Sequence, residues 1–193
     1  MFTGIVSAVA KVVEVGGGRI GIDHAGIARR LKLGGSVAVN GCCLTVVKKR
    51  GPVFFADTVP ETLRLTNLGK LERGVEVNLE LPLGATSTID GHLVQGHIDC
   101  TARVLSVQKV ASGRAVAIEL PAGVSRVVAM KGSIAVDGVS LTVATVDKPA
   151  GTFTVALIPH TLEMTIAGRY RRGSIVNLEA DVLARYVARN LAR

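Results

Sequence analysis

The stretch NGCCLTV (residues 40–46) decides the fold of this chain, because it returns as DGVSLTV at residues 137–143. Each copy begins with Asn-Gly or Asp-Gly, the dipeptides that favour tight hairpin turns. A strand pattern follows in which small polar residues alternate with apolar ones. One copy predicts a hairpin, whereas two copies in a chain of 193 residues predict a duplicated module.

The similarity extends to both sides of these copies. GSVAVNGCCLTV (35–46) matches GSIAVDGVSLTV (132–143) at most positions, and each module closes with Gly-x-x-Val-Asn-Leu-Glu. The other matched segments are 1–12 with 93–104, 26–31 with 123–128, 59–66 with 158–165, and 74–80 with 173–179. We therefore expect a first module at residues 1–92, a second at 93–180 and a C-terminal helical segment at 181–193.

Short strands separated by Gly and Asn turns predict an all-β fold in each module, either a closed antiparallel barrel or a sandwich. Closure is favoured because it removes exposed edges from small, Val-rich sheets. Brief helices are expected at 26–31 and 123–128, and also from Pro60 and Pro159, since proline suits the first helical turn.

The end of the chain has a different pattern. Apolar residues recur at helical spacing from Asp181 to about residue 191, which predicts an amphipathic helix. No copy of this segment follows the first module. Its apolar stripe suits either self-association of the chain or packing on its own module, and the sequence leaves both open.

Composition narrows the class of protein. The chain is 48% hydrophobic but 3% aromatic, its apolar runs are shorter than the ~20 residues of a membrane span, and its N-terminus does not resemble a signal peptide. We therefore expect a cytoplasmic protein without membrane association. The net charge of +8 raises nucleic acid as a partner, but the basic residues are dispersed and few aromatics could stack on bases, which favours a solvated basic surface.

Positions where the two copies differ in polarity are candidates for chemistry. Strand alternation puts Cys43 and Thr45 on one face, and Ser140 and Thr142 on the equivalent face of the second copy. The thiol and hydroxyls could also be small groups bonded to nearby backbone. The differing pairs are Cys43 and Ser140, Ile5 and His97, Asn40 and Asp137, and Pro82 and Asp181.

Two histidines, His92 and His97, lie at the junction of the modules and can exchange protons near neutral pH. Hydrogen-bonded structural roles are equally open for them. Their spacing and the lack of a third ligand do not indicate a zinc site, and the three cysteines form no CxxC pair. Asp181 could cap the N-terminus of the predicted helix or polarise a hydroxyl or water.

Together these segments resemble the riboflavin synthase family of the alpha-chain type. The resemblance rests on MFTGIV (1–6), NGCCLTV (40–46), GHLVQGHI (91–98), KGSIAVDGVSLTV (131–143) and IPHTL (158–162), in this order. It implies two six-stranded antiparallel Greek-key barrels in tandem, followed by a C-terminal helix that holds a homotrimer. It also implies transfer of a four-carbon unit between two molecules of 6,7-dimethyl-8-ribityllumazine, with no separate cofactor and no metal.

The resemblance further implies an active site between the first barrel of one subunit and the second barrel of its neighbour. The catalytic candidates are Cys43, His97, Ser140 and Asp181, with His92 and Thr142 in support. We expect the first pocket to be lined by Gly4, Ile5, Val6, Cys43, Leu44, Thr45, Thr62, Gly96, His97 and Ile98. We expect the second pocket to be lined by Lys131, Ser140, Leu141, Thr142, Ile158, Pro159, His160 and Thr161.

One alternative function remains open at this stage. Relatives of the duplicated barrel bind lumazines or flavins as accessory proteins without turning them over. Such a protein is expected to lose polar residues from one pocket, whereas both copies here keep theirs. Association with lumazine synthase, which supplies the substrate, is a further candidate interaction.

Overall fold

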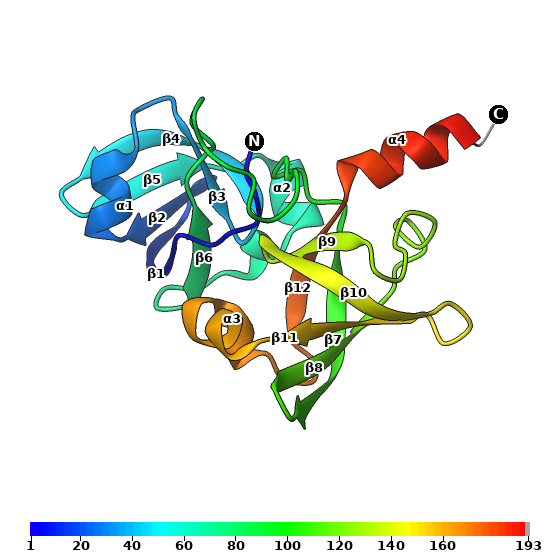
Figure 1. Cartoon of the computed structure of the whole chain (residues 1–193). Coiled ribbons are helices and arrows are strands. Elements are labelled where there is room, and N and C mark those ends of the chain that lie inside the picture. Colours follow the sequence, from blue (N-terminus) through cyan, green and yellow to red (C-terminus); the bar gives the residue numbers. More distant parts are fainter. Residues whose placement is uncertain (192–193) are drawn as a thin grey trace.

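The structure, a computed structural model, describes residues 1–191. Its first half is a closed barrel of six antiparallel strands in the order β1-β2-β5-β4-β3-β6 (Figure 1). The strands are β1 (Ala8–Gly16), β2 (Arg19–Asp23), β3 (Ser36–Val39), β4 (Cys42–Arg50), β5 (Val53–Asp57) and β6 (Glu76–Glu80).

The second half forms a closed barrel with the equivalent connections, in the order β10-β11-β8-β7-β12-β9. Its strands are β7 (Cys100–Val110), β8 (Gly113–Glu119), β9 (Ser133–Val136), β10 (Val139–Asp147), β11 (Thr152–Leu157) and β12 (Ile175–Ala180). The predicted all-β fold of two tandem six-stranded barrels is therefore confirmed, and closure rather than a sandwich is observed.

The duplication extends to local irregularities in the strands. A register shift follows Val12 on β1 and Val104 on β7, and another follows Val46 on β4 and Val143 on β10. Such bulges bend a strand and increase its twist, which helps a small sheet to close. Each barrel fills its interior with aliphatic side chains around one buried phenylalanine, Phe54 or Phe153.

Short helices follow the sequence prediction in part. Helices α1 (Ala25–Arg30), α2 (Pro60–Leu65) and α3 (Pro159–Met164) form as expected, and a 3-10 turn follows each of the last two, η1 (Asn67–Lys70) and η2 (Ile166–Arg169). The helix predicted at 123–128 was wrong, because this segment is a series of turns. In the first copy the His24 side chain accepts from Ile27 N and caps α1, whereas Pro121 at the equivalent position has no side-chain acceptor.

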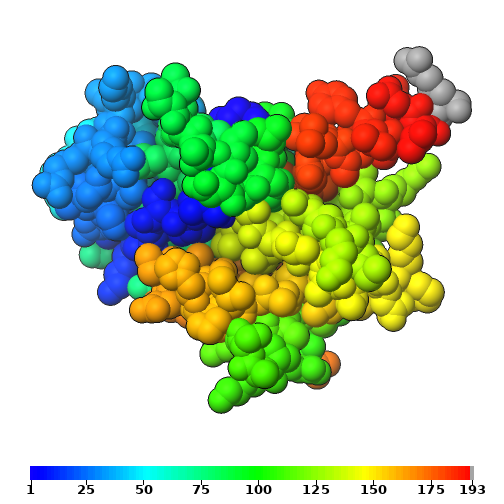
Figure 2. Space-filling view, in the orientation of Figure 1, coloured from blue at the N-terminus to red at the C-terminus, as the bar shows by residue number. Residues whose placement is uncertain are grey.

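The predicted C-terminal helix is α4 (Val182–Leu191), and it projects away from the second barrel (Figures 1 and 2). None of its described residues is buried, and Leu183, Tyr186, Val187 and Leu191 are 58 to 80% exposed. Residues 192 and 193 of the predicted helical segment lie outside the described residues. Within residues 1–191, no helix combines the length and apolarity that a membrane crossing requires.

Two asparagines of the closing Val-Asn-Leu-Glu segments join the barrels. Asn78 Nδ2 donates to Asp137 O at 2.9 Å, and Asn177 Nδ2 donates to Asn40 O at 2.8 Å. Between these bonds the turn glycines meet so closely that a Cβ on Gly41 would lie 2.6 Å from Gly138 N. The two copies of the turn that decide the fold therefore also form the centre of the contact between the barrels.

Candidate active site

Two chain segments pair between the barrels and bring the predicted site residues together. Phe2, near the N-terminus, exchanges backbone hydrogen bonds with Val94, and His92 N donates to Thr3 O at 3.1 Å. We call residues 1–6 and 93–98 the entry segments, because they hold equivalent positions at the start of the two modules. The residues that follow Phe2 and Val94 in the two segments are among those expected to line the pockets.

Each entry segment then crosses to the other barrel. Gly4 O accepts from Ser140 N at 2.8 Å, and Gly96 O accepts from Cys43 N at 2.9 Å. Val6 packs on the core of the second barrel, and Ile98 packs on the core of the first. The structure thus defines a Ser140 cluster (Gly4–Val6, His92 and Ser140–Thr142) and a Cys43 cluster (Gly96–Ile98 and Cys43–Thr45).

This crossing corrects the prediction of which barrel the residues of the first entry segment accompany. We expected Gly4, Ile5 and Val6 beside Cys43 of the first barrel, but the structure places them beside Ser140 of the second. The reason is that the Phe2–Val94 pairing carries both segments over the joint, and sequence similarity between the modules does not encode pairing across them. Gly96, the residue before His97, lies beside Cys43, and Ile98 packs on the core of the first barrel.

Glycine is required where each segment meets its strand. Gly4 and Gly96 have φ angles of 76° and 84°, in the left-handed region. A Cβ on Gly4 would lie 2.6 Å from Ser140 Cβ, and one on Gly96 would lie 2.5 Å from Cys43 Cβ. Only glycine permits both this conformation and this approach, and Ile5 and His97 are the residues that follow these glycines.

A buried carboxylate binds the backbone of each segment. Glu80 Oε1 accepts from Thr3 N at 2.7 Å and its Oε2 accepts from Gly4 N at 3.0 Å. Glu179 Oε1 accepts from Gln95 N at 2.6 Å and its Oε2 accepts from Gly96 N at 2.9 Å. These glutamates were not among the predicted site residues, although a carboxylate repeated at the end of both Val-Asn-Leu-Glu segments was a usable signal.

Ser140 has a histidine partner. His92 Nδ1 lies 2.7 Å from Ser140 Oγ, and His92 Nε2 is buried without a hydrogen-bond partner among the described residues. Burial lowers the pKa of His92, and the negative charge of Asp181 opposes that shift. Ser140, His92 and Asp181 therefore combine a hydroxyl, a neutral imidazole and a carboxylate in one region.

Asp181 also has the structural role considered from the sequence. Its Oδ1 accepts from Leu183 N at 2.9 Å, which caps the first turn of α4. The prediction that this residue starts the helix is confirmed. The cap and the electrostatic effect on His92 are compatible, since they use the same negative charge.

The Cys43 cluster has the same burial as the Ser140 cluster at equivalent positions but no buried histidine. Cys43 is half-buried, and Thr45 and His97 are exposed. The adjacent Cys42 faces the barrel core, where burial raises the pKa of its thiol to about 12. Strand alternation thus separates an inert core thiol from one at the surface.

The other predicted pocket residues lie at several positions. Leu44 and Leu141 belong to the two barrel cores, so only their backbone faces the site region. Thr62 lies on α2, while Ile158 precedes α3 and Pro159, His160 and Thr161 form its first turn. Lys131 and Thr142 are exposed, and Lys131 N is bonded to Val143 O beside the Ser140 strand.

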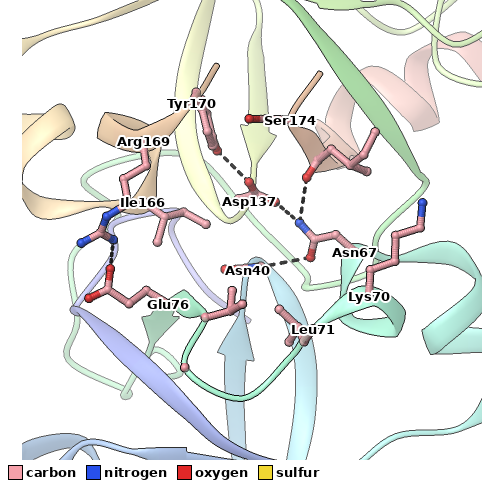
Figure 3. A pocket seen from close by; sticks show the side chains of 13 residues that line it. Asn40, Asn67, Lys70, Leu71, Glu76, Asp137, Ile166, Arg169, Tyr170 and Ser174 are labelled. Carbon is pink, nitrogen blue, oxygen red and sulfur yellow. Dashed lines mark hydrogen bonds and ion pairs between the residues drawn. The ribbon is translucent and has the colours of Figure 1, made fainter. Parts of the chain in front are cut away.

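A separate cavity of about 450 Å³ lies between the barrels (Figure 3). Asp137 at its floor accepts from Tyr170 Oη, from Asn67 Nδ2 and from Asn177 N, all at 2.8 Å, and Glu76 pairs with Arg169 at its rim. Asn40 and Asp137, one of the differing pairs, line it, but none of the residues expected in the two substrate pockets does. Because its polar floor groups bind one another, we assign this cavity to the joint rather than to the reaction.

The tandem barrels and their two polar clusters define the class of protein. A model of the lumazine binding domain matches residues 3–82 and again 95–181, so the chain is a double lumazine-binding-domain protein. The similarity to riboflavin synthases covers nearly the whole length: 43% identity to that of Mycobacterium tuberculosis over 98% of this chain and 97% of the relative. The riboflavin synthase of Bacillus subtilis is 35% identical over 99% of this chain and 90% of the relative. The chain belongs to the riboflavin synthase family, which confirms the resemblance noted from the sequence.

Solved structures with the same fold include proteins of a different name. The crystal structure of LumP complexed with riboflavin has a TM-score of 0.86 and 26% sequence identity, and covers 93% of this chain and 99% of LumP. LumP complexed with 6,7-dimethyl-8-(1'-D-ribityl) lumazine has a TM-score of 0.83 and 25% identity, with the same coverage.

Proposed function

We propose that this chain is a riboflavin synthase, which converts two molecules of 6,7-dimethyl-8-ribityllumazine into riboflavin and 5-amino-6-(D-ribitylamino)uracil. The observation that carries the proposal is the similarity to riboflavin synthases along nearly the whole chain. The reaction transfers a four-carbon unit from one substrate to an identical one. Every atom of the two substrates is retained in the two products, so the balance requires no outside oxidant.

The duplicated architecture suits a reaction between two identical molecules. Two similar half-sites that face each other would raise the effective concentration of one substrate near the other. The substrates must take different roles, and the two clusters supply different groups for this. One has a serine with a buried histidine, and the other has a half-buried cysteine beside an exposed histidine.

Ser140 and His92 are assigned to addition at C7 of one lumazine. The 2.7 Å contact lets His92 Nδ1 accept the hydroxyl proton as Ser140 Oγ adds, or as Ser140 orients a water that adds. The positive imidazole that forms is stabilised by the negative charge of Asp181. Thr142 shares the strand face of Ser140 and can hold the acceptor in place.

Cys43 and His97 are assigned to the second lumazine, whose acidic C7 methyl group must lose a proton before its carbon can attack. His97 is exposed and directly follows Gly96, whose carbonyl accepts from Cys43 N, so its imidazole is the proposed acceptor of this proton. The remaining pocket residues named above, including Ile5, Thr45, Thr62, Lys131, Ile158 and Thr161, are assigned to substrate binding.

Turnover of the proposed substrate is the deciding test. Purified protein mixed with 6,7-dimethyl-8-ribityllumazine should produce riboflavin, followed by its visible absorbance, with one uracil product formed for each riboflavin. A stable bound spectrum without riboflavin would contradict the enzyme assignment. It would leave the alternative favoured by the LumP fold, a lumazine- or flavin-binding accessory protein.

We also propose that the chain forms a homotrimer through α4, with each active site shared between subunits. The support is the uncovered apolar stripe of α4 and the open position of both clusters in one chain. Sedimentation equilibrium should give three times the chain mass of 20.1 kDa, and Leu183→Glu should shift it towards one. A monomeric parent protein with full activity would contradict this assembly.

The proposal extends to a cytoplasmic location and to association with lumazine synthase. The support for the association is chemical, since an enzyme that produces the lumazine would supply this reaction directly. Co-sedimentation of the two purified proteins is the test.

A further inference from the structure

Two buried carboxylates have no part in the reaction assigned above. Glu80 is 6% exposed and Glu179 is 1% exposed, and each lies at the end of the strand that closes its barrel. A carboxylate is costly to bury unless its oxygens are bonded. In both cases the partners are consecutive backbone N–H groups of an entry segment.

The bonds of Glu179 lead directly to the Cys43 cluster. Its Oε2 binds Gly96 N at 2.9 Å, and the carbonyl oxygen of Gly96 binds Cys43 N at 2.9 Å. The next residue is His97. Glu179 on β12 of the second barrel therefore determines, through one glycine, where His97 lies relative to Cys43 on β4 of the first.

We propose that Glu179 is a positioning residue for the Cys43 half-site and that it acts in its ionised form. Two N–H donors need two accepting oxygens, and a protonated carboxyl group offers one acceptor and one donor instead. Protonation therefore breaks one of the two bonds and lets the Gly96 turn shift. The inference rests on the proposed function, because its kinetic effect is read from turnover.

The two half-sites differ in how firmly this carboxylate is held. Glu80 also accepts from Thr3 Oγ1 at 2.9 Å, whereas Gln95 at the equivalent position gives Glu179 no side-chain donor. The charged or titratable groups near Glu179 are Asp99, just before β7, and the Cys42 thiol on β4, and Arg185 pairs with Asp99 at 2.8 Å. Burial raises the pKa of Glu179 to about 7, opposed by the N–H groups of Gln95 and Gly96.

Amide chemical shifts test the positioning without any need for activity. In ¹⁵N-labelled protein titrated from about pH 5 to pH 9, the Gln95 and Gly96 amides should shift together with a midpoint near 7. The Thr3 and Gly4 amides report on Glu80 instead, and their titration should survive Glu179→Gln. Glu179→Gln should abolish the first titration, while the matched control Asp137→Asn should leave it. The proposal would be overturned if the Gly96 amide shift did not change with pH, or if the Gln95 and Gly96 titration persisted in Glu179→Gln.

Kinetics test the consequence for the reaction. Glu179→Gln should lower kcat about tenfold or more with a change in KM below about threefold, because the groups are displaced rather than removed. The parent enzyme should lose activity as the pH falls through about 7, and this acid limb should be less steep in Glu179→Gln, because the contribution of Glu179 is gone while that of the catalytic bases remains. Glu179→Asp, which keeps the charge, should recover part of kcat. Glu80→Gln is the matched control, and it should keep the acid limb.

Stability separates positioning from a structural role. Folding raises the pKa of Glu179, so the free energy of unfolding falls as the pH rises and Glu179 ionises. Removal of this charge should therefore not destabilise the protein at pH 8, and Glu179→Gln should melt within about 5 °C of the parent protein. A large loss of thermal stability, or parental kcat and pH profile in Glu179→Gln, would contradict the proposal. A parent protein without turnover would instead overturn the proposed function, and the amide titration would still decide the role of Glu179.

Discussion

The Ser140 and Cys43 clusters have the same backbone and different side chains. In both, a carboxylate binds two consecutive N–H groups, the second of which belongs to a left-handed glycine, and the carbonyl of that glycine accepts from the N–H of the key strand residue. The side chains that this shared backbone carries differ. The Ser140 cluster has Ile5 and a serine bonded to His92, whereas the Cys43 cluster has His97 and a cysteine. The comparison shows how one duplicated scaffold can hold two identical substrates in different chemical roles.

The largest expected effect is on kcat, and it should differ between substitutions of Ser140 and of Cys43. Ser140→Ala should lower kcat for riboflavin formation by about 100-fold or more, because it removes the hydroxyl that His92 polarises. Cys43→Ser should lower kcat by about tenfold, since a hydroxyl remains at the same place. Steady-state rates with 6,7-dimethyl-8-ribityllumazine provide the measurement. Equal effects of the two substitutions would show that the clusters are chemically equivalent.

The shared backbone can be tested at its two glycines. Gly4→Ala and Gly96→Ala should each destabilise the protein by about 2 to 3 kcal/mol, because both combine a left-handed φ with a Cβ contact at 2.6 or 2.5 Å. Gly17→Ala is the matched control, with a φ of 59° and nothing within 4 Å of its Cβ. It should cost about 1 kcal/mol. Urea denaturation measures all three, and a Gly96→Ala loss no larger than that of Gly17→Ala would contradict the close approach.

The smallest effect comes from the turn residues Asn40 and Asp137, which occupy equivalent positions at the joint. Burial raises the pKa of Asp137 to about 6 from an ordinary 3.8, opposed by bonds from Asn177, Tyr170 and Asn67. As the pH rises, Asp137 loses its proton in the unfolded chain before it does so in the folded protein. The free energy of unfolding should therefore fall by about 1 to 2 kcal/mol as the pH rises from about 4 to 6 and then level off.

Asp137→Asn should flatten this part of the stability curve and keep the fold, because the first copy already uses asparagine at the equivalent position. Chemical denaturation at a series of pH values is the measurement. Asn40→Asp is the reverse control, since a new carboxylate there would face Asn67 Oδ1, which now accepts from Asn40 Nδ2 at 3.3 Å. A parental pH slope in Asp137→Asn would assign the dependence to another group.

Local patterns predicted most of the fold. Alternation and turn dipeptides indicated the strands, proline placed α2 and α3, and the apolar stripe placed α4. The failure at 123–128 has a local cause, because Pro121 replaces the capping His24 and the repeat similarity did not reveal it. Candidate site residues could be named from their differences between the copies, but their grouping could not.

The sequence alone determined that the chain is a duplication, because periodicity, turn chemistry and repeated segments are properties of neighbouring residues. The tertiary structure decided which parts of the two copies meet. The crossing of the entry segments, the His92–Ser140 contact and the bonds of Glu80 and Glu179 join residues up to 136 positions apart, the separation of Gly4 and Ser140. Such contacts depend on how two closed barrels pack against each other, and that packing is set by burial and backbone hydrogen bonding over the whole molecule.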